Sequence, residues 1–480
     1  MHNSRITEIL KSFSPAEIRE FKKFLESPFF GCKPFILKFY KELIRYYPEF
    51  DGDRVNRKVI FDKLYKGKTY DDGLFRKMSS DLVLLSEEYI LNVEFRNNKA
   101  FRDQSLLSGL RNKKLNNHFE LRSAKMQRKL EDDKAGSQTF FNRFLIQNEI
   151  HNHHLTIKNK ELGTHLESGL ISHTIIFTEH LLNFMRYMNS FKHEYVNQSE
   201  ILKNLLKNFD LKNFAESHIQ EDDEYFYYLK LIYLKYQISE YKDDEESYRK
   251  FKKLLFENKE KLTGHTVINS FAAMSQFIAR HNHKSDSKYI QDAFEINEII
   301  LKDKLFLEHS EFLQITFCGY HISTCRKLNR IDAVKDFLKT YSVYFHPDYK
   351  DEMINYCKAI ITFSENKFER SLALISEVNL DRPSLKASVK VLKIKNCYEL
   401  GYTEMLYSEL SALKRFCSSG TMLVDEFKLN IKNFIYTISK IAKLKEMNDT
   451  DELIILKKKT GKENNLLEKT WLMRKAGELM

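Results

Sequence analysis

The chain has 480 residues but only 14 glycines and 6 prolines, so its composition favours long helices joined by short turns. No sustained alternation of Val, Ile and Thr bounded by turn residues is found, which excludes a sheet-based fold and predicts an all-α protein. The 78 Lys and Arg residues against 67 Asp and Glu residues give a net charge of +11, an excess that is mild over this length but suits anionic partners.

The cysteines and the apolar runs exclude several further classes of protein. The 6 cysteines lie far apart and form no C-x-x-C pair, so neither a disulfide framework nor a zinc site is predicted. No apolar run reaches the ~18 residues that indicate a membrane-spanning helix. The segment Met1–Leu10 has no apolar centre, so we expect no secretory signal and a cytoplasmic protein.

Residues 1–100 predict a compact N-terminal unit of four helices. Ser14 caps the first helix, Pro15 takes its first position, and Glu17 reaches back to close a capping box. The Ser27–Pro28 pair ends this helix, because a residue that precedes proline avoids the helical region. The remaining helices are expected at Pro34–Tyr46, at Arg54–Tyr65 with Asp53 as its cap, and from Asp72 to about Phe95.

Two of these helices loosely resemble a helix-turn-helix. Arg54–Tyr65 and Asp72–Leu91 are joined by a short turn that contains Gly67, and in that motif the second helix enters the DNA major groove with its N-terminal residues first. Here those residues include the acidic Asp71 and Asp72, which phosphates would repel. Basic residues close to the turn argue the other way: Lys66, Lys68, Arg76 and Lys77. A structural hairpin is the favoured interpretation, and DNA contact stays open.

Residues 101–220 predict helical hairpins that connect the N-terminal unit to the rest of the chain. The stretch from Phe101 to Asp133 carries a run of basic residues: Arg111, Lys113, Lys114, Arg122, Lys125, Arg128 and Lys129. A basic helix beside a groove suits an anionic peptide or an RNA backbone. Acidic residues interspersed in the same stretch favour a solvated helix face instead: Glu120, Glu131, Asp132 and Asp133.

The same region is rich in histidine. Its histidines are His151, His153, His154, His165, His173, His180 and His193. Two pairs share a helix face by their spacing, His151 with His154 and His173 with His180. A metal site needs a third or fourth ligand and usually a carboxylate, and no H-E-x-x-H motif is present. We therefore expect polar and interfacial histidines on helices, with no metal site.

Residues 221–420 predict an array of helical hairpins. Glu224–Ser239 is apolar almost all round, which is typical of a buried helix, and we expect Lys230 and Lys235 to extend their ammonium groups outward. The residues that mark the second helix of each hairpin are mostly aromatic: Tyr248, Tyr289, Ile331, Phe368 and Tyr402. Their separations are 41, 42, 37 and 34 residues, so the last hairpins are the most regular.

Residues 352–417 resemble tetratricopeptide repeats, whose unit is 34 residues long. The residues that carry the resemblance are small or aromatic ones at helix contacts and a terminal proline: Ala359, Phe368, Ser371 and Pro383. Asn355 and Thr362 depart from the family pattern, which has Trp and Tyr there. The resemblance implies an α-α superhelix, a right-handed solenoid of helical hairpins, and places Ser371 where two helices touch. It implies nothing about the ligand.

The wider layout also resembles a group of uncharacterised bacterial helical-repeat proteins. The shared segments are Ser14–Glu17, Ser27–Phe30, Leu400–Tyr402 and Glu468–Leu472. This resemblance spans most of the chain and implies a fold, with no activity attached to it.

Residues 421–480 predict helices that cap the open end of the array. The segment Met422–Met447 carries an apolar stripe at helical spacing, formed by Ile431, Phe434, Ile435, Ile438 and Ile441, and leaves Lys432, Lys440 and Lys443 to water. Arrays of this kind need a terminal unit with a polar outer face. A last helix, Leu466–Leu479, carries Trp471, the only tryptophan. We expect Trp471 to pack back on the array, with docking of a partner as the alternative.

No catalytic motif is found: the sequence has no G-x-S-x-G, no Walker loop and no G-x-G-x-x-G. We therefore expect a non-enzymatic scaffold, without a cofactor, that binds a protein or peptide partner on its concave face. The alternative is a helical-repeat protein associated with RNA or DNA. Salt separates the two hypotheses, because affinity for nucleic acid falls steeply with salt concentration. The sequence assigns no partner-binding residue.

Overall fold

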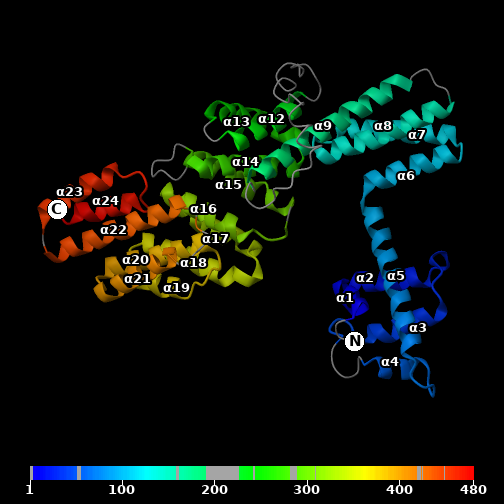
Figure 1. The fold of residues 1–480 in the computed structure, drawn as a ribbon, viewed down its shortest axis with the longest axis horizontal. Coiled ribbons are helices and arrows are strands. Elements are labelled where there is room, and N and C mark those ends of the chain that lie inside the picture. Colours follow the sequence, from blue (N-terminus) through cyan, green and yellow to red (C-terminus); the bar gives the residue numbers. More distant parts are fainter. Residues whose placement is uncertain are drawn as a thin grey trace. The chain divides into compact units, whose positions relative to one another are not determined.

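The computed structural model describes residues 4–50, 56–157, 162–190, 226–241, 244–281, 289–308, 310–418, 423, 425–447 and 449–480. Helices dominate this part of the chain, and none of it lies in a β-strand apart from two isolated bridges (Figure 1). The all-α prediction is confirmed. None of the described helices is long and apolar enough to cross a membrane.

The chain forms two compact units, which are considered separately. Unit 1 comprises residues 1–132 and 142–171, and unit 2 comprises residues 133–141 and 172–480. The helices α8 (Ser137–Ile157) and α9 (Leu162–Ser190) contribute residues to both. The four-part division expected from the sequence stays a prediction.

Unit 1 begins with tightly capped helices. Its whole helices are α1 (Arg5–Ser12), α2 (Pro15–Glu26), α3 (Pro34–Leu43), α4 (Arg57–Leu64), α5 (Asp72–Asn97), α6 (Lys99–Asn112) and α7 (Asn116–Asp132), with the short 3-10 helices η1 (Pro28–Phe30) and η2 (Ile44–Tyr46). The capping box predicted at α2 is confirmed. The backbone N–H of Glu17 donates to Ser14 Oγ at 3.3 Å, and that of Ser14 donates to Glu17 Oε2 at 2.7 Å.

Three details of unit 1 differ from the sequence expectation. A first helix, α1, precedes the predicted ones and starts at Ser4 with its own capping box. Helix α4 begins at Arg57 behind Asn56, which caps it, whereas the predicted cap Asp53 lies outside the described residues. The basic stretch from Phe101 to Asp133 is two helices and not one, because Lys114 adopts a left-handed conformation (φ 56°) that ends α6.

The core of unit 1 is aromatic. Phe21 of α2 meets the ring of Tyr40 on α3 edge-on at 5.2 Å, and Phe39 meets Phe75 of α5 in the same way at 5.4 Å. Such edge-to-face contacts add stabilisation beyond the burial of apolar area. Helix α5 is thus a core element of this unit, since Phe75 and Leu82 are almost fully buried.

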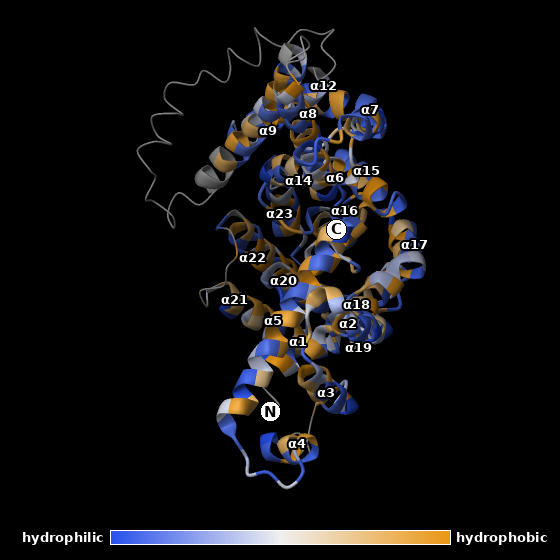
Figure 2. Ribbon diagram, turned by 90° about the vertical axis from the view of Figure 1, so that its right-hand side faces the viewer, coloured by the Kyte–Doolittle hydropathy of each residue, from blue (hydrophilic) through white to orange (hydrophobic). Residues whose placement is uncertain are grey.

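Unit 2 is a succession of helical hairpins that runs from α12 to α24 (Figure 1). Its helices are α12 (Phe226–Glu240), α13 (Glu245–Asn258), α14 (Gly264–His281), α15 (Ile290–Lys302), α16 (Ile315–Lys327), α17 (Ile331–Tyr341), α18 (Lys350–Ser364), α19 (Phe368–Ser376), α20 (Pro383–Leu400), α21 (Thr403–Ser418), α22 (Asp425–Met447), α23 (Thr450–Lys462) and α24 (Lys469–Glu478). The short 3-10 helices are η4 (Lys259–Lys261), η5 (Leu305–Glu308), η6 (Ser342–Tyr344) and η7 (Pro347–Tyr349). The helices carry both hydrophobic and hydrophilic residues, as amphipathic helices do (Figure 2).

Residues with a left-handed backbone end several of these helices. Asn329 follows α16 with φ 56°, Asn366 follows α18 with φ 59°, and Gly401 follows α20 with φ 72°. This conformation lets the chain reverse within a few residues and start the next helix. Gly319 serves a different purpose, because a Cβ atom there would come within 2.6 Å of the Leu385 side chain; its absence lets α20 approach α16.

Ser371 lies at the contact that the sequence predicted. Its side chain is fully buried, and its hydroxyl donates to the Ala359 carbonyl oxygen on α18 at 2.8 Å. Asn396 of α20 donates to the same hydroxyl at 3.0 Å. The small residue therefore joins three helices through a hydrogen-bonded contact that a larger side chain would separate.

One lysine of α12 contradicts the expectation that both extend outward. Lys235 is only 8% exposed, and its ammonium nitrogen lies 3.9 Å from Glu179 of α9, within unit 2. A buried ammonium group needs a compensating charge, and the nearby carboxylate supplies one. Lys230 is half-buried and lies over the ring of Tyr233 at 5.9 Å.

The last three helices form one core with the preceding hairpin. On α22 the residues Ile431, Phe434, Ile438 and Ile441 are fully buried, and Ile435 packs against the same core. Lys432 and Lys443 are exposed, and Lys440 is half-exposed, as the amphipathic pattern predicted. Trp471 and Leu472 of α24 belong to this core too, so the chain covers the end of the hairpin series with its own C-terminal helices.

Candidate partner-binding pocket

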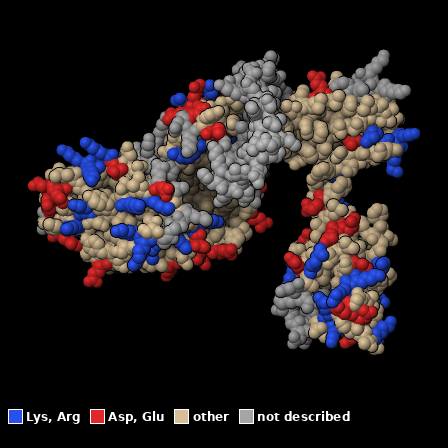
Figure 3. Space-filling model, viewed as in Figure 1, with Lys and Arg blue, Asp and Glu red and all other residues tan. Residues whose placement is uncertain are grey.

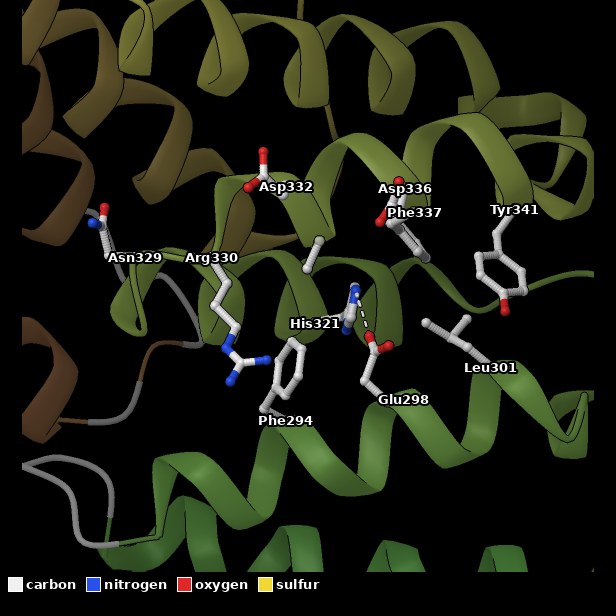
Figure 4. Close-up of a pocket in the computed structure, with 11 residues that line it drawn as sticks. Phe294, Glu298, Leu301, His321, Asn329, Arg330, Asp332, Asp336, Phe337 and Tyr341 are labelled. Atoms are coloured by element: carbon white, nitrogen blue, oxygen red, sulfur yellow. Dashed lines mark ion pairs between the residues drawn. The ribbon is translucent and has the colours of Figure 1, made fainter.

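A pocket of about 480 Å³ opens between α15 and α17, and α16 forms its floor (Figure 4). Helix α15 contributes an aromatic ring, a carboxylate and a leucine, α17 contributes two carboxylates and two aromatic rings, and the turn between α16 and α17 contributes a guanidinium group. The lining residues are Phe294, Glu298, Leu301, His321, Asn329, Arg330, Asp332, Ala333, Asp336, Phe337 and Tyr341.

His321 on α16 lies at the base of the pocket and is fully buried. Its ring packs against Phe337 at 4.7 Å and lies parallel to Phe294 at 6.4 Å between centroids. Burial lowers the pKa of His321 to about 4, because the apolar surroundings disfavour the charged imidazolium. The imidazole is therefore neutral near pH 7, and its Nδ1 has no hydrogen-bond partner among the described residues.

Cys325 lies one helical turn after His321, with its sulfur 3.6 Å from His321 Nε2. Burial, together with the nearby Glu298 carboxylate, raises the pKa of the Cys325 thiol to about 12. A nucleophilic cysteine needs the opposite change, namely a lowered pKa beside a cationic partner. Both groups are neutral here, so this pair packs the base of the pocket.

The rim of the pocket carries carboxylates. Glu298 rises from α15 toward His321, and its Oε1 lies 3.9 Å from His321 Nε2 (Figure 4). Desolvation raises the pKa of Glu298; Arg330 opposes this rise, whereas Asp336 adds to it. Asp332 and Asp336 stand four residues apart on α17, and neither forms an ion pair with any described residue.

Arg330 is the one cation among the described residues that line the pocket. The left-handed Asn329 turns the chain so that the Arg330 backbone N–H donates to the Cys325 carbonyl oxygen at 2.8 Å. The Arg330 guanidinium then lies over the face of Phe294, 4.6 Å from the ring centroid (Figure 4). The aromatic wall of the pocket thus already accommodates a cation in this structure.

A second group of charges in unit 2 is paired within the chain. This C-terminal charge cluster consists of Arg326, Lys395, Glu399, Glu468 and Lys475, whose side chains are all less than 20% exposed. The carboxylate of Glu468 accepts from Lys395 at 2.7 Å and also from Arg326. Burial alone would raise the pKa of Glu468, but the charges and hydrogen bonds of Arg326 and Lys395 lower it to about 2.

Trp471 belongs to the same region and is only 6% exposed. Its indole Nε1 donates to Glu399 at 2.9 Å, and its ring meets that of Tyr398 edge-on at 5.5 Å. Lys475, one turn later, pairs with Glu399 at 2.7 Å. The expectation that Trp471 packs back on the hairpins is confirmed, and the indole is not presented to a partner.

The histidine-rich region of the sequence forms ordinary helix packing where the structure describes it. His153 is buried, stacks on Phe119 at 3.9 Å between centroids and lies 3.1 Å from Glu120; desolvation lowers its pKa. His165 shares a hydrogen bond with Gln147 at 2.7 Å. His173 and His180 are exposed, and His193 lies outside the described residues. No three potential ligands come together within the described ranges to form a metal site.

The basic residues of α6 and α7 point mainly to solvent. Arg111 pairs with the buried Glu149 of α8 at 3.3 Å, so part of this charge stabilises unit 1. The exposed ones are Lys113, Lys114, Arg122, Lys125, Arg128 and Lys129. In unit 2, basic and acidic side chains are interspersed over the visible face (Figure 3). Contact with nucleic acid stays a prediction.

The candidate helix-turn-helix is embedded in unit 1. Asp71 caps α5 by accepting from the Leu74 backbone N–H at 3.0 Å. Asp72 pairs with Arg76 at 2.6 Å and with Arg57 of α4 at 3.6 Å. In a helix-turn-helix the first turn of this helix would contact DNA. Here its charged side chains instead form a helix cap and ion pairs within unit 1.

Sequence reasoning did not find the pocket. The i, i+4 spacing of Asp332 and Asp336 was the available signal, since it places both carboxylates on one face of a helix. No protein-family model, no curated protein and no solved structure matches the chain. The case for a function therefore rests on the geometry of the described residues.

Proposed function

We propose that the chain is a cytoplasmic, non-enzymatic helical-repeat scaffold of the tetratricopeptide type, and that it binds a protein or peptide partner. The single observation that supports this proposal is the pocket between α15 and α17. It combines aromatic walls with two carboxylates, Asp332 and Asp336, that form no ion pair with any described residue. Binding sites commonly combine an apolar surface with a few convergent polar groups.

The chemistry of the pocket also supports a binding role. The His321 and Cys325 side chains at its base are fully buried and neutral near pH 7. The charged groups of the lining are three carboxylates and one guanidinium, and Asn329 and Tyr341 add an amide and a hydroxyl. Such groups orient a ligand by charge and hydrogen bonds. The carboxylates stand on helices α15 and α17, and helices fix the positions of side chains more closely than loops do.

Photo-crosslinking through the pocket tests this proposal. Tyr341 is replaced by p-benzoylphenylalanine, a conservative aromatic change at the pocket wall, in cells that express the full chain. The matched control carries the same residue at Tyr436 of α22, which is 50% exposed and lies outside the pocket. We expect a discrete protein adduct at residue 341, identified by mass spectrometry, and no such adduct at residue 436.

Two results would contradict the proposal. Equal adducts at both positions would show non-specific capture. An adduct with nucleic acid, with affinity that falls steeply as salt rises, would favour the alternative of a nucleic-acid-associated protein.

A further inference from the structure

Among the described residues that line the pocket, negatively charged side chains outnumber positively charged ones. Glu298, Asp332 and Asp336 supply three carboxylates, whereas Arg330 supplies the only cation of the lining. His321 adds no positive charge near pH 7. Like charges close together disfavour each other, so a ligand that brings a positive charge relieves this repulsion.

Besides the carboxylates of the rim, the aromatic walls of the pocket also favour a cation. Phe294, Phe337 and Tyr341 present aromatic rings, and the face of an aromatic ring attracts guanidinium and ammonium groups. Arg330 demonstrates this attraction at 4.6 Å from the Phe294 centroid. The Phe337 and Tyr341 rings on the opposite helix have no cation over them among the described residues.

One ring nitrogen of the imidazole at the base of the pocket also lacks a hydrogen bond among the described residues. His321 is fully buried, yet its Nδ1 has no hydrogen-bond partner within the part of the chain that the structure describes. A buried polar atom without a partner costs about 1–3 kcal/mol, so a ligand that reaches it gains affinity. Charge, aromatic walls and the imidazole thus indicate one kind of occupant.

We propose that this pocket binds the cationic side chain of a lysine or arginine in a partner protein. The inference deepens the proposed scaffold function, on which it rests, by naming the chemistry of the partner. The ammonium or guanidinium group lies between Glu298 and Asp336 and packs on the rings of α17. An anionic ligand such as a nucleic-acid backbone is disfavoured, because three carboxylates would face its phosphates.

The direct test uses fluorescein-labelled nonapeptides of glycine and serine with one variable central residue. The central residue is arginine, lysine, citrulline or norleucine, and binding to the full chain is measured by fluorescence anisotropy at low salt. Citrulline keeps the shape of arginine without its charge, and norleucine keeps the aliphatic stem of lysine. We expect the arginine and lysine peptides to bind about tenfold more tightly than their neutral counterparts.

The variant Glu298→Gln/Asp336→Asn tests the carboxylates with minimal change in shape. It should reduce the affinity for the arginine and lysine peptides about tenfold and leave the affinity for the neutral peptides unchanged. The matched control, Asp351→Asn/Glu404→Gln, makes the same charge change at exposed carboxylates outside the pocket and should bind as the unaltered chain does. A second variant, Ala333→Arg, supplies a cation from within the pocket wall and should block the cationic peptides.

Equal binding of charged and neutral peptides would overturn the inference, as would unchanged binding by the double variant and by Ala333→Arg. These failures are distinguishable from failure of the scaffold proposal. A protein adduct at residue 341 would still support a partner in the pocket, although one of different chemistry. Loss of the adduct together with loss of cationic binding would overturn both.

Discussion

Unit 2 contains two groups of charged residues that differ in one respect, namely whether their charges are paired within the chain. In the C-terminal charge cluster, Glu468 bridges Arg326 and Lys395, and Glu399 pairs with Lys475. In the pocket, Asp332 and Asp336 pair with no described residue. The first arrangement holds helices together, and the second leaves two carboxylates without an ion pair among the described residues.

The comparison teaches that burial of charge alone does not indicate a binding site. The pKa of Glu468 is lowered to about 2, and its carboxylate joins α16, α20 and the start of α24. Strongly perturbed groups cluster at functional sites, but structural ion-pair networks perturb pKa values as well. The pairing of the charges, and not the size of the pKa change, distinguishes the structural cluster from the pocket for which we propose a binding role.

The largest effect is expected when the whole C-terminal cap is removed. Truncation after Met447 deletes α23 and α24, and with them Leu453, Trp471 and Leu472 of the shared core. The apolar face of α22 would then be exposed, so we expect a large drop in melting temperature accompanied by aggregation. Deletion of Met480 alone, which is 52% exposed, serves as the control. A truncated protein as stable as the full chain would refute this role of the C-terminal helices.

A single substitution in the charge cluster should be the next most damaging change. Glu468→Gln leaves Arg326 and Lys395 without their carboxylate in a site that is mostly shielded from water. Removing one partner of a buried ion pair lowers the free energy of unfolding by ~3–5 kcal/mol. Urea unfolding measures this difference. Glu257→Gln is the control, because Glu257 is 58% exposed and pairs weakly with Lys253 at 3.9 Å. Equal stabilities for the two variants would show that the cluster is dispensable.

The pH dependence of stability should differ between His321, at the base of the pocket, and Glu468, in the C-terminal charge cluster. His321 has a folded-state pKa of about 4 against an ordinary 6.5, so the unfolded chain binds its proton first as the pH falls. The free energy of unfolding should therefore fall as the pH decreases from 6.5 to 4, by about 3 kcal/mol in total. Above pH 6.5 His321 is neutral in both states and causes no such loss. For Glu468 the corresponding loss of stability occurs between pH 4.5 and 2.

Urea unfolding at several pH values measures both windows. His321→Gln should flatten the pH dependence between 6.5 and 4, whereas Glu468→Gln should flatten it only below 4.5. If His321→Gln leaves the upper window unchanged, His321 is not the group that titrates there.

A smaller effect is expected at the contact of α18, α19 and α20. Ser371→Phe would overpack the site where the Ser371 hydroxyl donates to Ala359 and accepts from Asn396, at a cost of about 1–3 kcal/mol. Hydrogen exchange around residues 352–417 should accelerate. Ser376→Phe places the same side chain at an exposed position of the same helix and should change little. Unaltered exchange and melting in Ser371→Phe would show that this contact tolerates a large side chain.

Local patterns predicted much of the fold. The Ser14 capping box and the buried stripe of α22 follow from spacings within a few residues. These two features depend on cap chemistry and helical periodicity, which a sequence shows directly. The close contact at Ser371 was implied by the resemblance to tetratricopeptide repeats, and the structure has it.

The pocket could not be predicted in the same way, because it depends on contacts between helices. Glu298 and Asp336 are 38 residues apart, and nothing in the spacing shows that α15 and α17 face each other across α16. The partners of Glu468 are farther still, 142 residues away for Arg326 and 73 for Lys395. The expectation for Lys235 was wrong for the same reason. Its long side chain was expected to extend the ammonium group outward from an apolar helix, but the ammonium group lies buried beside Glu179 of another helix.

The most direct test of the distinction between paired and unpaired charges measures stability and peptide binding on the same variants. Glu298→Gln/Asp336→Asn and Glu468→Gln are each characterised by urea unfolding and by anisotropy with the arginine peptide. The pocket variant should stay within about 0.5 kcal/mol of the unaltered chain and bind the peptide about tenfold more weakly. Glu468→Gln should lose ~3–5 kcal/mol of stability and, while folded, bind the peptide as before. The reverse pattern, in which the pocket variant unfolds easily and still binds while Glu468→Gln is stable, would contradict the account.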